Sequence, residues 1–122
     1  MSIVTFTNLR EAINAIRTAF GDDKKDMPLS WAELLLLVAE RGDEGITTKE
    51  IYETLNMSQG IASRTVKLMS TYYDKQTEQV DGYDLLSIHQ DMVYRHRQRV
   101  RLTPKGWDIM NSAVASLENT PL

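Results

Sequence analysis

ITTKEIYETLNMSQGIASRTVKLMSTYY, residues 46–73, contains the pattern from which the fold of this chain can be predicted. Thr47 is suited to cap a first helix, and Glu50, three residues later, would complete a capping box. The pattern then breaks, and Ser58 is suited to cap a second helix that runs over about residues 59–73. Two short helices joined by a tight turn predict a helix-turn-helix.

The second of these helices has one apolar and one polar face. Its apolar stripe recurs at spacings of four, three and four residues, on Ala62, Val66, Met69 and Tyr73. The polar face, with the cap and one edge residue, forms the candidate DNA-reading surface: Ser58, Gln59, Gly60, Ile61, Ser63, Arg64 and Lys67. Gln59 suits adenine edges, Arg64 suits guanine edges, and Lys67 suits phosphates. The same pattern also fits an amphipathic helix whose polar face meets only water.

A second signal follows at residues 94–103, YRHRQRVRLT, where arginine occupies every other position. Strand side chains alternate in direction, so four guanidinium groups are expected on one face: Arg95, Arg97, Arg99 and Arg101. Residues 85–88 supply a partner strand, which leaves roughly residues 89–93 as the turn. We therefore expect a two-stranded wing over about residues 85–103, with its four arginines contacting DNA.

These features together resemble the MarR family of winged helix-turn-helix regulators. The resemblance rests on Leu55 to Met69, LNMSQGIASRTVKLM, on the arginine-bearing hairpin, and on Leu102 to Gly106, LTPKG. Residues that match the family pattern are Ser58, Ala62, Ser63, Arg64 and Val66 in the recognition helix, and Leu102, Thr103 and Gly106 after the wing. The likeness covers about residues 30–118.

The sequence departs from the family pattern in two places. The family carries an acidic residue and an arginine as D-x-R at the wing, whereas Asp91 here precedes Arg95 by four residues. Residues 74–84, DKQTEQVDGYD, are also longer than the connection that the family places between recognition helix and wing. This segment fits either a loop or a longer hairpin arm, and its polar composition favours the plain loop.

The resemblance implies a mainly α-helical, winged helix-turn-helix fold with a small β-hairpin wing, of the α+β class. We expect one domain over residues 1–122, with the helix-turn-helix at about 47–73. Helices at about 8–20 and 104–118 are expected at its two ends, opened by Asn8 and by Thr103 with Pro104. In this family the first and last helices join in a dimer interface.

Apolar stripes on the two terminal helices make up the candidate dimer interface. It comprises Leu9, Ile13, Ile16, Phe20, Met110, Val114 and Leu117. From the residues alone the first stripe fits either its own subunit or a partner, and the resemblance favours the partner. Gly106, near the start of the last helix, leaves room for another backbone to approach.

Composition and charge set further bounds. The chain has 122 residues, 42% of them hydrophobic, and no cysteine, so disulfides and cysteine-based zinc sites are excluded. Its net charge is −3, but residues 89–106 carry five basic side chains against Asp91, which gives +4 there and −7 elsewhere. Local field rather than net charge governs docking onto DNA.

Patterns typical of catalysis or metal binding are missing from the sequence. No glycine-rich phosphate loop follows a strand, and no serine or threonine sits beside a histidine in a nucleophile motif. His89 and His96 have no ligand partners at zinc spacing. We expect neither an enzyme, nor a cofactor, nor a metal site. Without a signal peptide or long apolar run, the expected location is cytoplasmic, in a bacterial, archaeal or phage-infected host nucleoid, with no membrane partner.

The leading hypothesis is a sequence-specific, double-stranded DNA-binding transcriptional regulator. It would be a homodimeric repressor that reads a pseudo-palindromic operator with its recognition helix and arginine-rich wing. The resemblance also implies an optional small-molecule effector, whose identity the sequence does not indicate. Alternatives are a winged-helix module that binds protein and a DNA-binding protein of replication, phage or plasmid maintenance.

Overall fold

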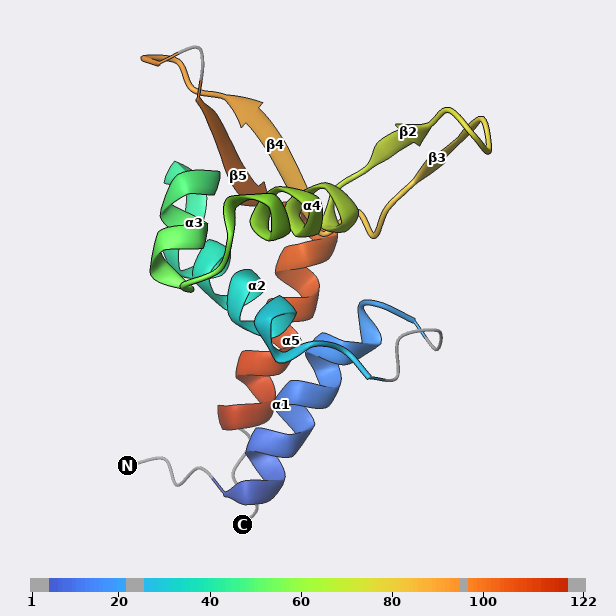
Figure 1. The fold of residues 1–122 in the computed structure, drawn as a ribbon. Coiled ribbons are helices and arrows are strands. Elements are labelled where there is room, and N and C mark those ends of the chain that lie inside the picture. The colour runs from blue at the N-terminus through green and yellow to red at the C-terminus, as the bar shows by residue number, and fades with distance from the viewer. Residues whose placement is uncertain (1–4, 22–25, 95–96, 119–122) are drawn as a thin grey trace.

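The computed structural model describes residues 5–21, 26–94 and 97–118. The elements in chain order are α1 (Phe6–Thr18), α2 (Leu29–Arg41), the 3-10 helix η2 (Gly42–Glu44), β1 (Ile46–Thr47), α3 (Thr48–Thr54), α4 (Gln59–Met69), β2 (Tyr72–Asp74), β3 (Gln79–Asp81), β4 (Leu86–Gln90), β5 (Gln98–Leu102) and α5 (Pro104–Glu118). Helices α1 and α5 lie side by side at one end of the molecule, α2 crosses the middle, and α3, α4 and the sheet form the other end (Figure 1).

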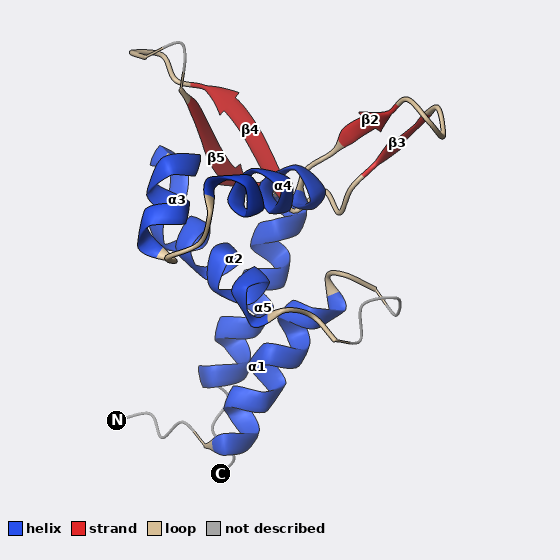
Figure 2. Cartoon of the chain, viewed as in Figure 1, coloured by secondary structure: helices blue, strands red, loops and turns tan. Residues whose placement is uncertain are grey.

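The core joins these two ends. Its fully buried side chains come from α2, from the helix-turn-helix and from the sheet: Leu34, Leu35, Val38, Ile46, Ile51, Met69, Leu85, Leu86 and Val100. The sheet is antiparallel with strand order β1-β5-β4, while β2 and β3 form a separate two-stranded hairpin (Figure 2). This mainly helical fold with a β-hairpin wing is the predicted one.

The helix-turn-helix consists of α3 and α4. Thr47 caps α3 by accepting a hydrogen bond from the Glu50 backbone N–H at 3.1 Å, as predicted. The Glu50 carboxylate, expected to complete a capping box, instead accepts from the Thr47 hydroxyl at 3.3 Å and from Arg41 at 2.7 Å. In the turn, Asn56 adopts a left-handed conformation with φ 52°. Asparagine tolerates that conformation better than most residues, so the chain reverses there without glycine. Ser58 then caps α4 by accepting from the Ile61 N–H at 3.1 Å.

Helix α4 is shorter than predicted, because it ends at Met69 and not at Tyr73. The Ser70 hydroxyl donates to the Val66 carbonyl at 2.7 Å, and the backbone at Ser70 turns extended. The Thr-Tyr-Tyr run that follows is β-branched and aromatic, which favours a strand. Tyr73 therefore lies in β2, 59% exposed, and not on the buried stripe of α4.

The favoured plain loop at residues 74–84 is also wrong, because β2 and β3 form a hairpin arm, residues 72–81, that projects beside α4 (Figure 1). Both ends of the arm return to the end of α4. Gly82, at φ +106°, passes so close to the helix that an added Cβ would lie 1.9 Å from the Ser70 carbonyl oxygen. Next to it, the Tyr83 N–H donates to the Leu68 carbonyl at 3.1 Å. The arm is therefore an insertion whose two ends both attach at the C-terminal end of α4.

The wing forms from β4 and β5, with Ile88 opposite Val100 in the register. Its second strand begins at Gln98, later than the predicted start at residue 94, and the described residues of the connection are 91–94 and 97. The turn lies later than predicted because the Asp91 carboxylate accepts hydrogen bonds from the Val93 and Tyr94 N–H groups. The alternation pattern of the sequence does not reveal these bonds. Burial alternates along β5 as predicted: Val100 and Leu102 are buried, and Arg99 and Arg101 are half-buried.

Helix α1 begins earlier than predicted. Thr5 caps it, and Asn8 is the third helical residue, bonded to Thr5 in a capping box. The Asn8 side chain also donates to the Ser116 carbonyl of α5 at 2.7 Å, which ties the two terminal helices together. Helix α5 has the predicted bounds. Gly106 allows α5 to lie close to Leu85, the residue before β4, since an added Cβ would lie 2.4 Å from the Leu85 carbonyl oxygen.

Candidate nucleic-acid interface

The two faces of α4 separate as the sequence predicts. Its buried side packs against the core through Ala62, Thr65, Val66 and Met69. The whole set of predicted DNA-reading residues lies exposed on the other side: Ser58, Gln59, Gly60, Ile61, Ser63, Arg64 and Lys67. A contact within the helix partly holds Arg64, and a contact with β2 partly holds Lys67. The Arg64 Nε donates to the Gly60 carbonyl at 3.3 Å, and the Lys67 ammonium lies 5.1 Å from the centre of the Tyr72 ring.

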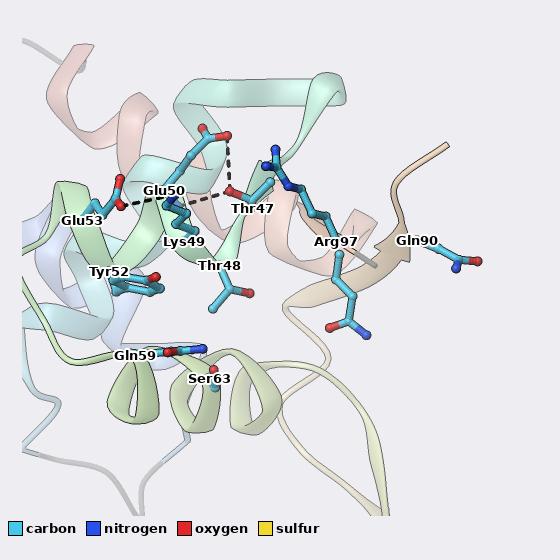
Figure 3. A pocket seen from close by; sticks show the side chains of 11 residues that line it. Thr47, Thr48, Lys49, Glu50, Tyr52, Glu53, Gln59, Ser63, Gln90 and Arg97 are labelled. Atoms are coloured by element: carbon cyan, nitrogen blue, oxygen red, sulfur yellow. Dashed lines mark hydrogen bonds and ion pairs between the residues drawn. The ribbon is translucent and has the colours of Figure 1, made fainter. Parts of the chain in front are cut away.

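A hollow of about 840 Å³ separates α3 and α4 from the wing. From the helices it is lined by Thr47, Thr48, Lys49, Glu50, Tyr52, Glu53, Gln59 and Ser63, and from the wing by Gln90, Arg97 and Gln98. In Figure 3, Gln59 and Ser63 face the hollow from α4 while Arg97 reaches from the wing toward the start of α3. Amide and hydroxyl groups both donate and accept hydrogen bonds, so this lining suits base edges and phosphates alike.

Each carboxylate in the hollow is next to a cation. Glu50 forms an ion pair with Arg41 at 2.7 Å, and Glu53 lies 3.9 Å from Lys49. Both pairs are exposed, so each is weak and screened by salt. Their consequence is electrostatic, because the pairing offsets the negative charge that would otherwise repel phosphate.

The four wing arginines do not act as one set. Arg99 donates to the Asp91 carboxylate at 2.9 Å and to the Glu44 carbonyl at 3.2 Å. The stem of Arg101 packs over Gly45, and its Nε is buried with no hydrogen-bond partner. Arg97 is exposed, with its guanidinium 4.7 Å from the centre of the Tyr94 ring. Arg95 lies outside the described residues. Arg97 is therefore the described wing arginine that is best placed for an external contact.

Asp91 organises the wing turn. Its carboxylate is 5% exposed and accepts hydrogen bonds from the Val93 N–H at 2.8 Å and the Tyr94 N–H at 3.1 Å, besides the Arg99 contact. The two backbone N–H groups, and then Arg99, lower the Asp91 pKa from 3.8 to about 2. The acid-arginine pairing expected of the wing is thus present, but between residues eight apart in sequence.

The candidate dimer residues divide between two environments. Ile16, Phe20 and Met110 are buried in their own subunit. Phe20 packs against the rings of Trp31 and Tyr83, with centroids 5.0 and 4.9 Å away. Leu117 is partly buried. The exposed members of the set are Leu9, Ile13 and Val114, at 46%, 50% and 47% of their surface.

Several solved structures share this arrangement of helices and wing. MepR from S. aureus, in its complex with DNA, matches with a TM-score of 0.63 and 14% identity, over 88% of this chain and 73% of MepR. A MarR-family transcriptional regulator from Rhodococcus sp. RHA1 matches at 0.56 and 14%, over 87% of this chain and 64% of that chain. The adhesin competence repressor AdcR from Streptococcus pyogenes matches at 0.56 and 18%, over 87% and 69%.

The chain has the winged-helix fold of the MarR family. That fold is the one the resemblance implied, although no protein-family model and no curated protein matches the sequence. Relative to the MarR pattern, the arm at residues 72–81 stands between recognition helix and wing.

Several residues of the hollow were missed by sequence reasoning. Gln90 and Gln98 face each other across the wing, and Thr48 and Lys49 open α3. The period-2 alternation of the wing did not reveal Gln98, because it grouped Gln98 with the buried Val100 and Leu102 and not with Arg97. Within the described residues, no helix is long and apolar enough to cross a membrane, and no group of three metal-ligating side chains forms.

Proposed function

We propose that this protein is a sequence-specific, double-stranded DNA-binding regulator of transcription that acts as a homodimeric repressor. The exposed face of α4 would enter the major groove, and the wing would follow the neighbouring backbone or minor groove. The hollow between them would hold one phosphate strand. In this view Gln59 and Arg64 read base edges, while Ser63, Lys67 and Arg97 contact phosphates.

One observation carries the proposal: α4 is fixed on its buried side by the core and presents small, amide, hydroxyl and basic groups on the other, with one exposed apolar side chain, Ile61, at the edge. No carboxylate interrupts that exposed face. Recognition of protein through this face would call for a broader apolar surface or for acidic groups. Ile61, 47% exposed at the edge, fits contact with a thymine methyl group.

The homodimer is proposed from the exposed part of the terminal-helix stripe. Leu9, Ile13 and Val114 lie on the two helices that Asn8 joins, at the end of the molecule opposite α4. Two-fold pairing there would direct both α4 helices toward one face of a duplex. It predicts a pseudo-palindromic operator with half-sites about 34–36 Å apart. The MepR complex with DNA and the name of the repressor AdcR support the regulatory role by analogy of fold.

The proposal is tested by Arg64→Ala. Because Arg64 is exposed and forms no ion pair among the described contacts, its loss should leave the fold intact. We expect affinity for a selected duplex, measured by fluorescence anisotropy, to fall by about 1–3 kcal/mol, with relaxed preference at one base pair. Arg10→Ala, an exposed arginine on α1, is the matched control and should bind like the wild type.

Equal binding by Arg64→Ala and Arg10→Ala would count against α4 as the reading element. The alternative, a protein-binding module, has a specific surface of its own on the arm. Tyr73 and Val80 face each other across β2 and β3, at 59% and 72% exposure, among acidic neighbours. If that alternative holds, neither arginine variant alters DNA affinity, and variants of the arm reduce capture of a partner.

A further inference from the structure

The turn of the wing exposes two apolar side chains. Met92 is 93% exposed and Val93 is 78% exposed, while Tyr94 beside them is 51% exposed. A single exposed apolar residue is ordinary on protein surfaces. Adjacent apolar residues at the tip of a projecting hairpin are less so, because turn positions usually carry polar residues.

Hydrogen bonds to side chains and backbone groups fix the conformation of this turn. The buried Asp91 carboxylate accepts from the N–H groups of Val93 and Tyr94, and it is held in turn by Arg99. The Asp91 N–H donates to the Arg97 carbonyl at 2.9 Å, and the Arg97 N–H donates to the Tyr94 carbonyl at 2.8 Å. These bonds fix the backbone that carries Met92 and Val93, so little backbone entropy remains to be lost there on binding. The exposed Met92 side chain still loses rotamer freedom when it is buried.

The position of the tip indicates which partner it meets. The wing extends beyond α3 and α4 (Figure 1), and its residues Gln90, Arg97 and Gln98 line the hollow shared with α4. The tip therefore continues the candidate DNA surface. Exposed Arg97 stands next to it, stacked on Tyr94. A cation beside an apolar point is complementary to a minor groove, where anionic phosphates border stacked bases.

We propose that Met92 and Val93 form a wedge that enters the minor groove of duplex DNA and partly unstacks one base step, bending the duplex. The proposal rests on the DNA-binding function proposed above and adds deformation of the DNA to it. Proteins that insert methionine or other apolar side chains between base pairs kink the duplex at the point of entry. Flexible pyrimidine–purine steps are the easiest to open, so they are the expected targets of the wedge.

The test uses the full chain and a duplex that it selects from a random pool. The fluorescent base analogue 2-aminopurine is placed at successive positions beside the half-site, and its fluorescence should rise at one base step when the wild type binds. Fluorescence energy transfer between dyes at the two ends of the duplex should increase as the duplex bends. Met92→Ala with Val93→Ala should abolish both signals and weaken binding by roughly five- to a hundredfold, leaving the major-groove preference unchanged. Met92→Leu should preserve both signals, since leucine also serves as a wedge.

Val80→Ala is the matched control, because Val80 is 72% exposed on the arm, the other hairpin. This substitution should leave the 2-aminopurine signal, the bend and the DNA affinity unchanged. Circular dichroism would verify that each variant is folded. Unchanged fluorescence, bend and affinity in the double variant would overturn the wedge while leaving DNA binding intact. A loss of self-association without any change on DNA would also overturn it, by assigning the tip to a second copy. Absence of duplex binding by the wild type would instead refute the proposed function itself.

Discussion

Gly60 lies in the first turn of α4, where the fold gives no reason for a glycine. A Cβ added there would meet no atom within 4 Å, and its backbone is not in the left-handed region. Glycine lowers the stability of a helix relative to alanine, and no contact around Gly60 in the described structure requires a glycine there. Close approach of a DNA backbone or base to this turn would explain it.

Gly60→Ala should therefore separate stability from binding. We expect the free energy of unfolding to rise by about 0.5–1 kcal/mol, measured by denaturant titration. DNA affinity should fall by on the order of 1 kcal/mol, because the methyl group would crowd the interface. A variant that is more stable and binds DNA as well as the wild type would show that nothing approaches α4 closely at this point.

The wing shows how one residue shapes an element. Because the Asp91 pKa is lowered in the folded chain, its contribution to stability is fully present above about pH 4. That contribution is lost as pH falls through the folded pKa of about 2. The turn should keep its conformation at any pH where DNA binding is measured.

We expect the Val93 and Tyr94 amide chemical shifts to titrate with a midpoint near 2, and Asp91→Ala to shift both at neutral pH. In that variant the tip should lose the three hydrogen bonds that the carboxylate accepts, and with them its order, while α4 should be unaffected. An observed midpoint near the ordinary value of 3.8 would mean that the carboxylate does not hold the turn.

Elements governed by local signals could be predicted from the sequence, whereas elements governed by distant contacts could not. Caps at Thr47 and Ser58 bond to N–H groups three residues away, so both helix starts were predicted. The arm depends on Gly82 passing the end of α4, and the turn depends on Asp91 reaching Arg99. Neither contact has a period or a fixed spacing that a sequence pattern would reveal.

The same limit applies to the candidate site. Residues on the face of α4 followed from helical periodicity and are exposed as expected. Alternation correctly separated Arg99 and Arg101 from Val100 and Leu102, but it did not show that Arg99 is held by Asp91 or that the Arg101 stem packs over Gly45. Likewise, a 3.6-residue stripe on α1 does not distinguish Ile16, buried in the core, from Ile13, exposed to solvent.

At the scale of the whole molecule, the proposed function requires two copies of the chain. Ile13→Glu places a charge in the exposed stripe and should convert the proposed dimer to monomer in sedimentation velocity, with helical content retained. DNA affinity should drop sharply as the two half-sites are no longer bound together. Leu36→Glu, at a residue 49% exposed on α2, is the matched control and should remain dimeric. A dimer that survives Ile13→Glu would place the interface elsewhere.

Selection from a random duplex pool at near-physiological salt decides whether a pair of α4 helices reads DNA sequence. A dimeric sequence reader should enrich an inverted repeat with half-sites about 10–10.5 base pairs apart, or a multiple of that spacing. Failure to enrich any sequence, together with binding that disappears as salt rises, would mean that only phosphates are contacted and would rule out sequence reading by α4.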